Sequence, residues 1–85
     1  MGMTRKRFIK LAMGKGVSRN TARDIAKTLR EMRETESRIE HFVKTGEEEK
    51  AQKAFMAYKI LKIKANLHEW IAKIEAQRYA RANNI

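Results

Sequence analysis

Three stretches of the chain carry apolar residues at the spacing of amphipathic helices. In the first, over residues 4–13, Phe8, Leu11 and Ala12 fall at i, i+3 and i+4 and so share one helical face. Two glycines follow this stretch within a few residues, and glycine can take the positive φ that ends a helix. The pattern therefore predicts a short first helix over residues 4–13.

The second stretch predicts a longer helix over residues 18–44. Ser18 belongs to the residue types that cap helix starts, and Gly46 suits the position just past a helix end. The apolar positions keep a helical spacing that weakens only between residues 33 and 37. These positions are Ala22, Ile25, Ala26, Leu29, Met32, Ile39, Phe42 and Val43.

The third stretch, residues 47–82, predicts a helix of roughly 50 Å at 1.5 Å per residue. This helix has two apolar faces with polar residues between them. We expect the face with larger side chains to be core, and it carries Met56, Ile60, Ile63, Leu67, Trp70, Ile71 and Ile74. The opposite face is rich in alanine and carries Ala76 together with the predicted interface residues Ala54, Tyr58, Leu61, Ala65, Ala72 and Tyr79.

A helix with two apolar faces needs two neighbours, and the two preceding helices can cover only one of these faces along its length. Small residues allow another helix to approach closely. The alanine-rich face is therefore predicted to hold a second copy of the chain or another protein. The expected fold is all-α: one domain over residues 1–85, with a short N-terminal helix before an antiparallel pair of long helices, assembled as a homodimer.

Composition excludes several classes of protein. The 85 residues include no cysteine and no proline, so disulfides and thiolate metal sites are excluded. No apolar run approaches the length of a membrane span, and no apolar signal core follows the basic start, so a cytoplasmic location is expected. His41 and His68 are isolated, and the residues from His68 to Ala72 do not form an HExxH motif. We therefore expect no enzymatic activity, no metal and no cofactor.

The charge is distributed unevenly along the chain. The net charge is +10, from 20 basic and 10 acidic residues. Residues 1–30 hold nine basic residues and one acid, residues 31–50 have a net charge of −3, and residues 51–85 have a net charge of +5. A strongly basic first third indicates an anionic partner that binds in a defined orientation.

Residues 11–25, LAMGKGVSRNTARDI, resemble the helix-turn-helix of DNA-binding proteins. In that motif a small residue follows a hydrophobic one, a glycine stands in the turn, and a polar residue caps the reading helix. Two positions depart from the motif. Ala22 stands where a larger apolar residue is usual, and Lys15 stands where an apolar residue is usual. The positions that match the helix-turn-helix motif are Leu11, Ala12, Gly16, Val17, Ser18 and Ile25.

The whole chain also resembles, in style, small phage and mobile-element proteins of Gram-positive bacteria.

The resemblance implies DNA binding, and the placement of the cations supports the same function independently. Four cations of the second helix recur at i, i+4, i+8 and i+11, which places them in one narrow sector facing away from its apolar stripe. Basic residues of the first helix add an arm for the phosphate backbone, and the N-terminus at Ser18 offers a phosphate site. The predicted nucleic-acid-binding residues are Arg5, Lys6, Arg7, Lys10, Lys15, Ser18, Arg19, Asn20, Arg23, Lys27 and Arg30.

Other interpretations remain open at this stage. A cationic helix face is often only solvated, and Glu31 and Glu34 can pair with Lys27 and Arg30 at i, i+4. Duplex DNA is favoured over RNA as the ligand, but the sequence does not separate the two. The alternative to nucleic-acid binding is a helical interaction module, such as a phage effector that docks on a host protein.

Overall fold

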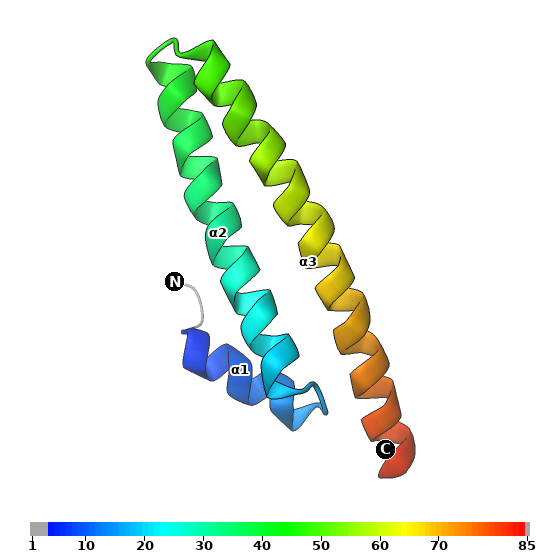
Figure 1. Cartoon of the computed structure of the whole chain (residues 1–85). Helices are drawn as coiled ribbons and strands as arrows, with labels where there is room; N and C mark the ends of the chain where they lie inside the picture. The colour runs from blue at the N-terminus through cyan, green and yellow to red at the C-terminus, as the bar shows by residue number, and fades with distance from the viewer. Residues whose placement is uncertain (1–3, 85) are drawn as a thin grey trace.

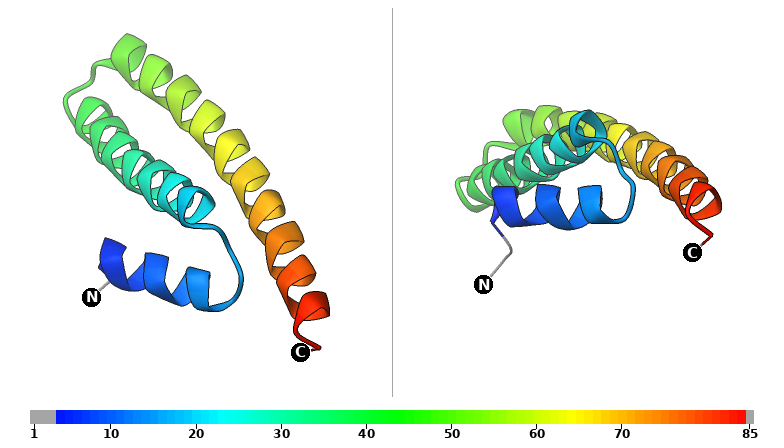
Figure 2. Two further views of the ribbon diagram at one scale, coloured as in Figure 1. Left: turned by 60° about the horizontal axis from the view of Figure 1, so that its bottom comes forward. Right: turned by 90° about the horizontal axis from the view of Figure 1, so that it is seen from below.

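A computed structural model describes residues 4–84, which form three helices: α1 (Arg5–Gly14), α2 (Arg19–Lys44) and α3 (Glu48–Ala82) (Figure 1). No strand occurs in this part of the chain. The long helices α2 and α3 run antiparallel along one another, and α1 folds back across the first half of α2 (Figures 1 and 2). The predicted all-α fold is confirmed, and each helix begins and ends within one residue of its predicted bounds.

The helix ends follow from the capping residues. The Thr4 side chain accepts a hydrogen bond from the Arg7 N–H at 3.2 Å, and the Ser18 side chain accepts one from the Thr21 N–H at 3.2 Å. Both turns contain a glycine in the left-handed region, with φ of 95° at Gly16 and 74° at Gly46. Because only glycine takes this conformation without strain, the two turns are fixed by these residues.

The contact between α2 and α3 is made by small side chains. Ala22 is 0% exposed and Thr28 is 2% exposed, and Thr35 and Ala65 are also buried. The Thr35 hydroxyl donates to the Glu31 carbonyl of its own helix at 2.7 Å, so this buried polar group is satisfied. The small residues allow the helices to pack closely, but they give a core of limited apolar area.

The prediction that the larger apolar face of α3 is core is wrong. Ile60, Ile63 and Trp70 are 66%, 70% and 62% exposed. The alanine-rich face packs on α2 instead, and Ala65 is its buried residue. Five of the six predicted interface residues, Ala54, Tyr58, Leu61, Ala65 and Ala72, are therefore buried or half-buried within this one chain and do not offer a free surface.

Tyr79, the sixth predicted interface residue, is partly exposed but has a neighbour within the chain. It lies against Gly16 in the turn between α1 and α2, so closely that a Cβ on Gly16 would overlap its side chain. The C-terminal end of α3 therefore packs against the turn between α1 and α2, which lies within the segment that resembles a helix-turn-helix. Nowhere in residues 4–84 does a helix have the length and hydropathy to cross a membrane.

Candidate nucleic-acid interface

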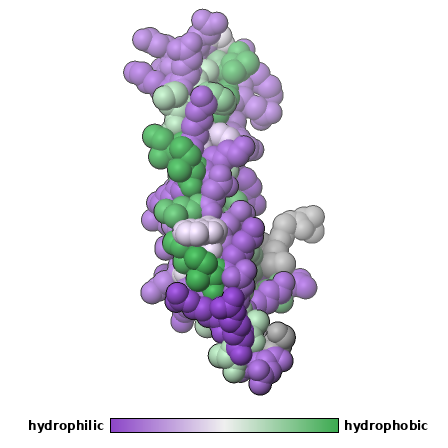
Figure 3. All heavy atoms as spheres, turned by 90° about the vertical axis from the view of Figure 1, so that its right-hand side faces the viewer, coloured by the Kyte–Doolittle hydropathy of each residue, from purple (hydrophilic) through white to green (hydrophobic). Residues whose placement is uncertain are grey.

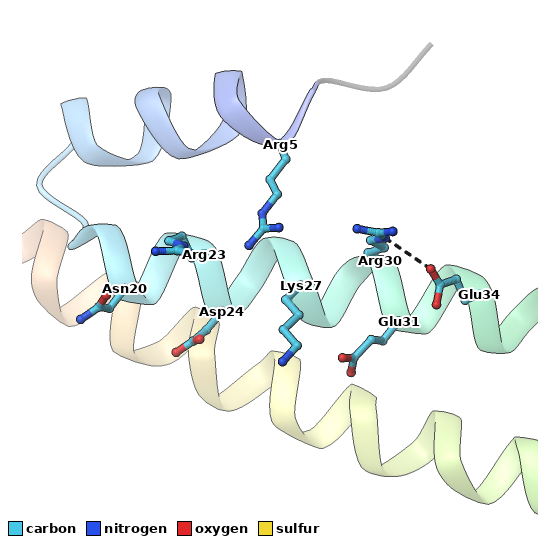
Figure 4. A pocket seen from close by; sticks show the side chains of 8 residues that line it. All are labelled: Arg5, Asn20, Arg23, Asp24, Lys27, Arg30, Glu31 and Glu34. Carbon is cyan, nitrogen blue, oxygen red and sulfur yellow. Dashed lines mark hydrogen bonds and ion pairs between the residues drawn. The ribbon is translucent and has the colours of Figure 1, made fainter.

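A groove of about 750 Å³ runs along the outer side of α2, and Arg5 of α1 reaches across toward it (Figure 4). Five of the predicted nucleic-acid-binding residues meet here, because α1 folds back along the first turns of α2. Three acidic side chains share the groove with them. The lining residues are Arg5, Asn20, Arg23, Asp24, Lys27, Arg30, Glu31 and Glu34.

The groove is weakly basic in total, since its four cations face three carboxylates. Figure 4 shows Arg23 and Arg30 on the α1 side of α2, with Glu34 beside Arg30, whereas Asp24, Lys27 and Glu31 point toward α3. An anion that approaches from the α1 side therefore meets Arg5, Arg23 and Arg30 first. Asp24 lines the groove but was not among the predicted site residues.

One of the two expected ion pairs is present. Arg30 Nε lies 3.3 Å from Glu34 Oε1, and both side chains are more than half exposed. Lys27 and Glu31 do not form an ion pair within the described residues. An exposed pair of this kind contributes only about 0–1 kcal/mol, so a phosphate can replace the carboxylate at little cost.

The other predicted cations lie outside the groove and are exposed. Lys6, Arg7 and Lys10 extend along α1, Lys15 is in the turn, and Arg19 opens α2. α1 is held on α2 by half-buried Phe8, Ile9 and Ala12, which leaves its basic side chains in solvent. The predicted set is therefore spread over one end of the molecule and does not form a single pocket.

The N-terminus of α2 is not a vacant anion site. The Ser18 N–H donates to Glu75 Oε1 of α3 at 3.2 Å, so a carboxylate of the same chain occupies the position expected for a phosphate. Burial tends to raise the pKa of Glu75, but hydrogen bonds from the Thr21 side chain and from Ser18 outweigh it, and the pKa lies below its ordinary value. Ser18 is thus a capping residue bonded to α3, which revises its predicted role.

Sequence reasoning missed Glu75 because its role depends on which face of α3 packs on α2. Glu75 follows Ala72 by three residues and precedes Tyr79 by four, so it belongs to the alanine-rich face. Once that face is placed against α2, the carboxylate lies at the α2 N-terminus. The helix spacing was visible in the sequence, but the choice of face was not.

We expect Glu75→Gln to lower the stability of the protein at pH 7 by about 1 kcal/mol, because a neutral amide interacts less favourably with the helix N-terminus. A carboxyl group with a lowered pKa in the folded state stabilises the fold above its unfolded value, near 4.5. This contribution is lost as the pH falls through the lower folded value. Thermal melts followed by circular dichroism at pH 7 and pH 3 would test this.

The difference in melting temperature between Glu75→Gln and the parent should shrink toward zero at pH 3. A difference of equal size at both pH values would contradict the interaction. Glu69→Gln is a suitable control, because Glu69 is an exposed carboxylate of the same helix without a bond to α2 within the described residues.

Among residues 4–84, no three His, Asp or Glu side chains come together as metal ligands. Comparisons of the chain with protein-family models, with curated proteins and with solved structures find no match. The distribution of charge and the exposed apolar surface are therefore the features of this chain that bear on its function.

Proposed function

We propose that this protein binds nucleic acid through α1 and the first half of α2. The observation that carries the proposal is the excess of exposed cations at this end. All nine basic residues between positions 5 and 30 are exposed, and one acid accompanies them. Of these nine cations, only Arg30 forms an ion pair within residues 4–84. Solubility does not require so one-sided a surface, whereas phosphate binding does.

The spacing of the groove cations suits a regular array of phosphates. Arg23, Lys27 and Arg30 span seven residues, or about 10 Å of helix, which equals about three steps of 3.4 Å along one DNA strand. A single helix also fits the major groove, where arginine and asparagine can contact base edges. This supports duplex DNA as the favoured ligand, with α2 as the reading helix that the helix-turn-helix resemblance implies. RNA remains the variant that the test must separate.

The test is a fluorescence-anisotropy titration with labelled duplex DNA and duplex RNA over a series of salt concentrations. If about five cations contact phosphates, the affinity should fall about 500-fold between about 50 and 200 mM salt. Tighter binding to RNA at every salt concentration would change the ligand class. Absence of binding to both at the lowest salt would refute the proposal.

Single variants assign roles within this surface. Arg19→Ala and Asn20→Ala should change the preference among DNA sequences, whereas Lys6→Ala should weaken binding to all sequences alike and lower the salt slope by about one. Lys53→Ala is the matched control, because it removes an exposed cation of α3 near the other end of the helix pair.

The exposed apolar residues of α3 favour a second candidate function, a protein-interaction module without catalysis. The two candidates use different surfaces and can be separated in one experiment. Neutralising Arg19 and Arg23 together should abolish nucleic-acid binding and leave protein association intact. Replacing Ile63 and Trp70 with serine should have the opposite effect.

A further inference from the structure

α3 exposes a continuous row of large apolar side chains on the side away from α2. We call this row the outer face of α3. Figure 3 views the molecule from the α3 side, where hydrophobic side chains recur along the helix between polar ones. Each of these side chains is at least 37% exposed, which is unusual for so many large apolar residues on one helix. They are Met56, Ile60, Ile63, Leu67, Trp70 and Ile71.

The exposed area exceeds what a single chain of this size normally leaves in water. The accessible surface is 7059 Å². A compact monomer of 10.0 kDa exposes about 5,200 Å². The excess of about 1,800 Å² is more than twice the area of about 800 Å² that each partner contributes to a standard protein interface. The excess belongs to the elongated molecule as a whole, with extents of 55 × 24 × 16 Å, and the large side chains of the outer face are part of the surface that this shape leaves uncovered.

The outer face is self-complementary when two copies run antiparallel. The half-buried Ile74 continues this row at the helical spacing of Met56, Ile60, Ile63, Leu67 and Trp70, and the midpoint of the extended row lies at residue 65, halfway between Met56 and Ile74. An antiparallel pairing about this point sets Ile63 against Leu67 and Ile60 against Trp70 of the other copy. Met56 meets Ile74 in the same way, so large apolar side chains meet along the row as in helix pairs of coiled-coil type, except that Ile71 lies opposite Lys59.

The charges at the two ends of the outer face select the same orientation. Glu49 lies sixteen residues before the midpoint and Arg81 lies sixteen residues after it, and both are exposed. At 100° per residue both fall within the sector of the outer face, and the exposed cations Lys53 and Arg78 fall there as well. An antiparallel pair therefore places each Glu49 beside the other copy's Arg81, whereas a parallel pair would place like charges together.

We propose that the outer face of α3 binds a second copy of this chain in an antiparallel helix pair. The homodimer expected from the sequence would then form through the face opposite to the predicted one. This proposal does not depend on nucleic-acid binding, because the cations of α1 and α2 lie outside the contact.

The protein carries its own probe for this contact, since Trp70 is its single tryptophan and is 62% exposed in one chain. Light scattering after size exclusion should give a mass of two chains at micromolar concentrations. On dilution, the Trp70 emission should shift to the red as the dimer dissociates and the indole enters water. A single-chain mass up to the highest soluble concentration, with red emission throughout, would overturn the proposal.

Ile63→Asp should convert the dimer into a monomer, because the two introduced carboxylates would lie close together near the two-fold axis. Ile63 is 70% exposed, so the helical content of the single chain should be retained in circular dichroism. Asn66→Asp is the control: it adds the same charge to the same helix outside the outer face, and it should remain a dimer.

Charge reversal tests the orientation. Glu49→Arg alone and Arg81→Glu alone should each weaken the dimer several-fold, and the double variant should restore it. Mixing the two single variants should also give a heterodimer that is tighter than either alone. If reversal has no effect on a dimer that Ile63→Asp disrupts, the antiparallel arrangement is wrong. Emission that shifts only on addition of anionic lipid vesicles would assign the outer face to a membrane surface instead.

Discussion

Gly16→Ala is expected to destabilise the protein by about 2–4 kcal/mol, through two effects that act at one atom. Gly16 has a φ of 95°, a conformation in which a Cβ is strained. The added Cβ would also overlap the Cβ and ring of Tyr79, which cannot move away without shifting α3. A fall in Tm of at least about 10 °C in a circular-dichroism melt is the expected result.

The other two glycines of the described chain separate these effects. Gly46 shares the positive φ but has open space around its Cβ position, so Gly46→Ala should show the backbone strain alone, about 1–2 kcal/mol. Gly14 is helical and also has open space, so Gly14→Ala should be neutral or stabilising by up to about 1 kcal/mol. If Gly16→Ala costs no more than Gly46→Ala, the contact with Tyr79 is not formed.

Ala65→Leu is expected to cost about 1–3 kcal/mol, because Ala65 is buried against α2 and a larger side chain would force the helices apart. The matched control is Ala57→Leu, on an exposed position of the same helix, which should change the stability by less than about 0.5 kcal/mol. Urea unfolding followed by circular dichroism would measure both.

This pair of variants also decides which face of α3 packs on α2. If the face with Ile63 and Trp70 were the core, Ala65→Leu would be harmless and Ile63→Ser would be severe. The structure requires the reverse order for the stability of the single chain.

Most of the helical architecture could be predicted from the sequence, because its signals are local. Ser18 caps α2, the glycines at 16 and 46 stop helices, and the apolar spacing sets the helix lengths. The choice between the two faces of α3 could not be predicted from apolar content. The face of α3 with small residues packs on α2, because small side chains such as Thr28 and Ala65 allow the two helices to approach closely. The hydrophobicity of a face does not show how closely a neighbouring helix can approach it.

In the candidate site, too, features that depend on neighbouring residues could be predicted from the sequence, and contacts between distant residues could not. The exposed cations of α1 and α2 follow from helix periodicity and lie where the charge pattern placed them. The hydrogen bond between Ser18 and Glu75 joins residues 57 positions apart, so no local sequence pattern predicts it. The phosphate site predicted at Ser18 assumed a free helix N-terminus, whereas the Ser18 N–H donates to Glu75 in the folded chain.

The contacts at the two ends of the α2–α3 pair differ in the sequence separation of the residues that they join. At the Gly46 turn the bonds join near neighbours, such as the Glu47 N–H and the Phe42 carbonyl, whereas Ser18–Glu75 and Gly16–Tyr79 close a loop of most of the chain. Closing a long loop is slow and entropically costly, so we expect folding to start at the Gly46 turn. Loss of the Gly16 contact should then shorten the lifetime of the folded state and leave the folding rate nearly unchanged.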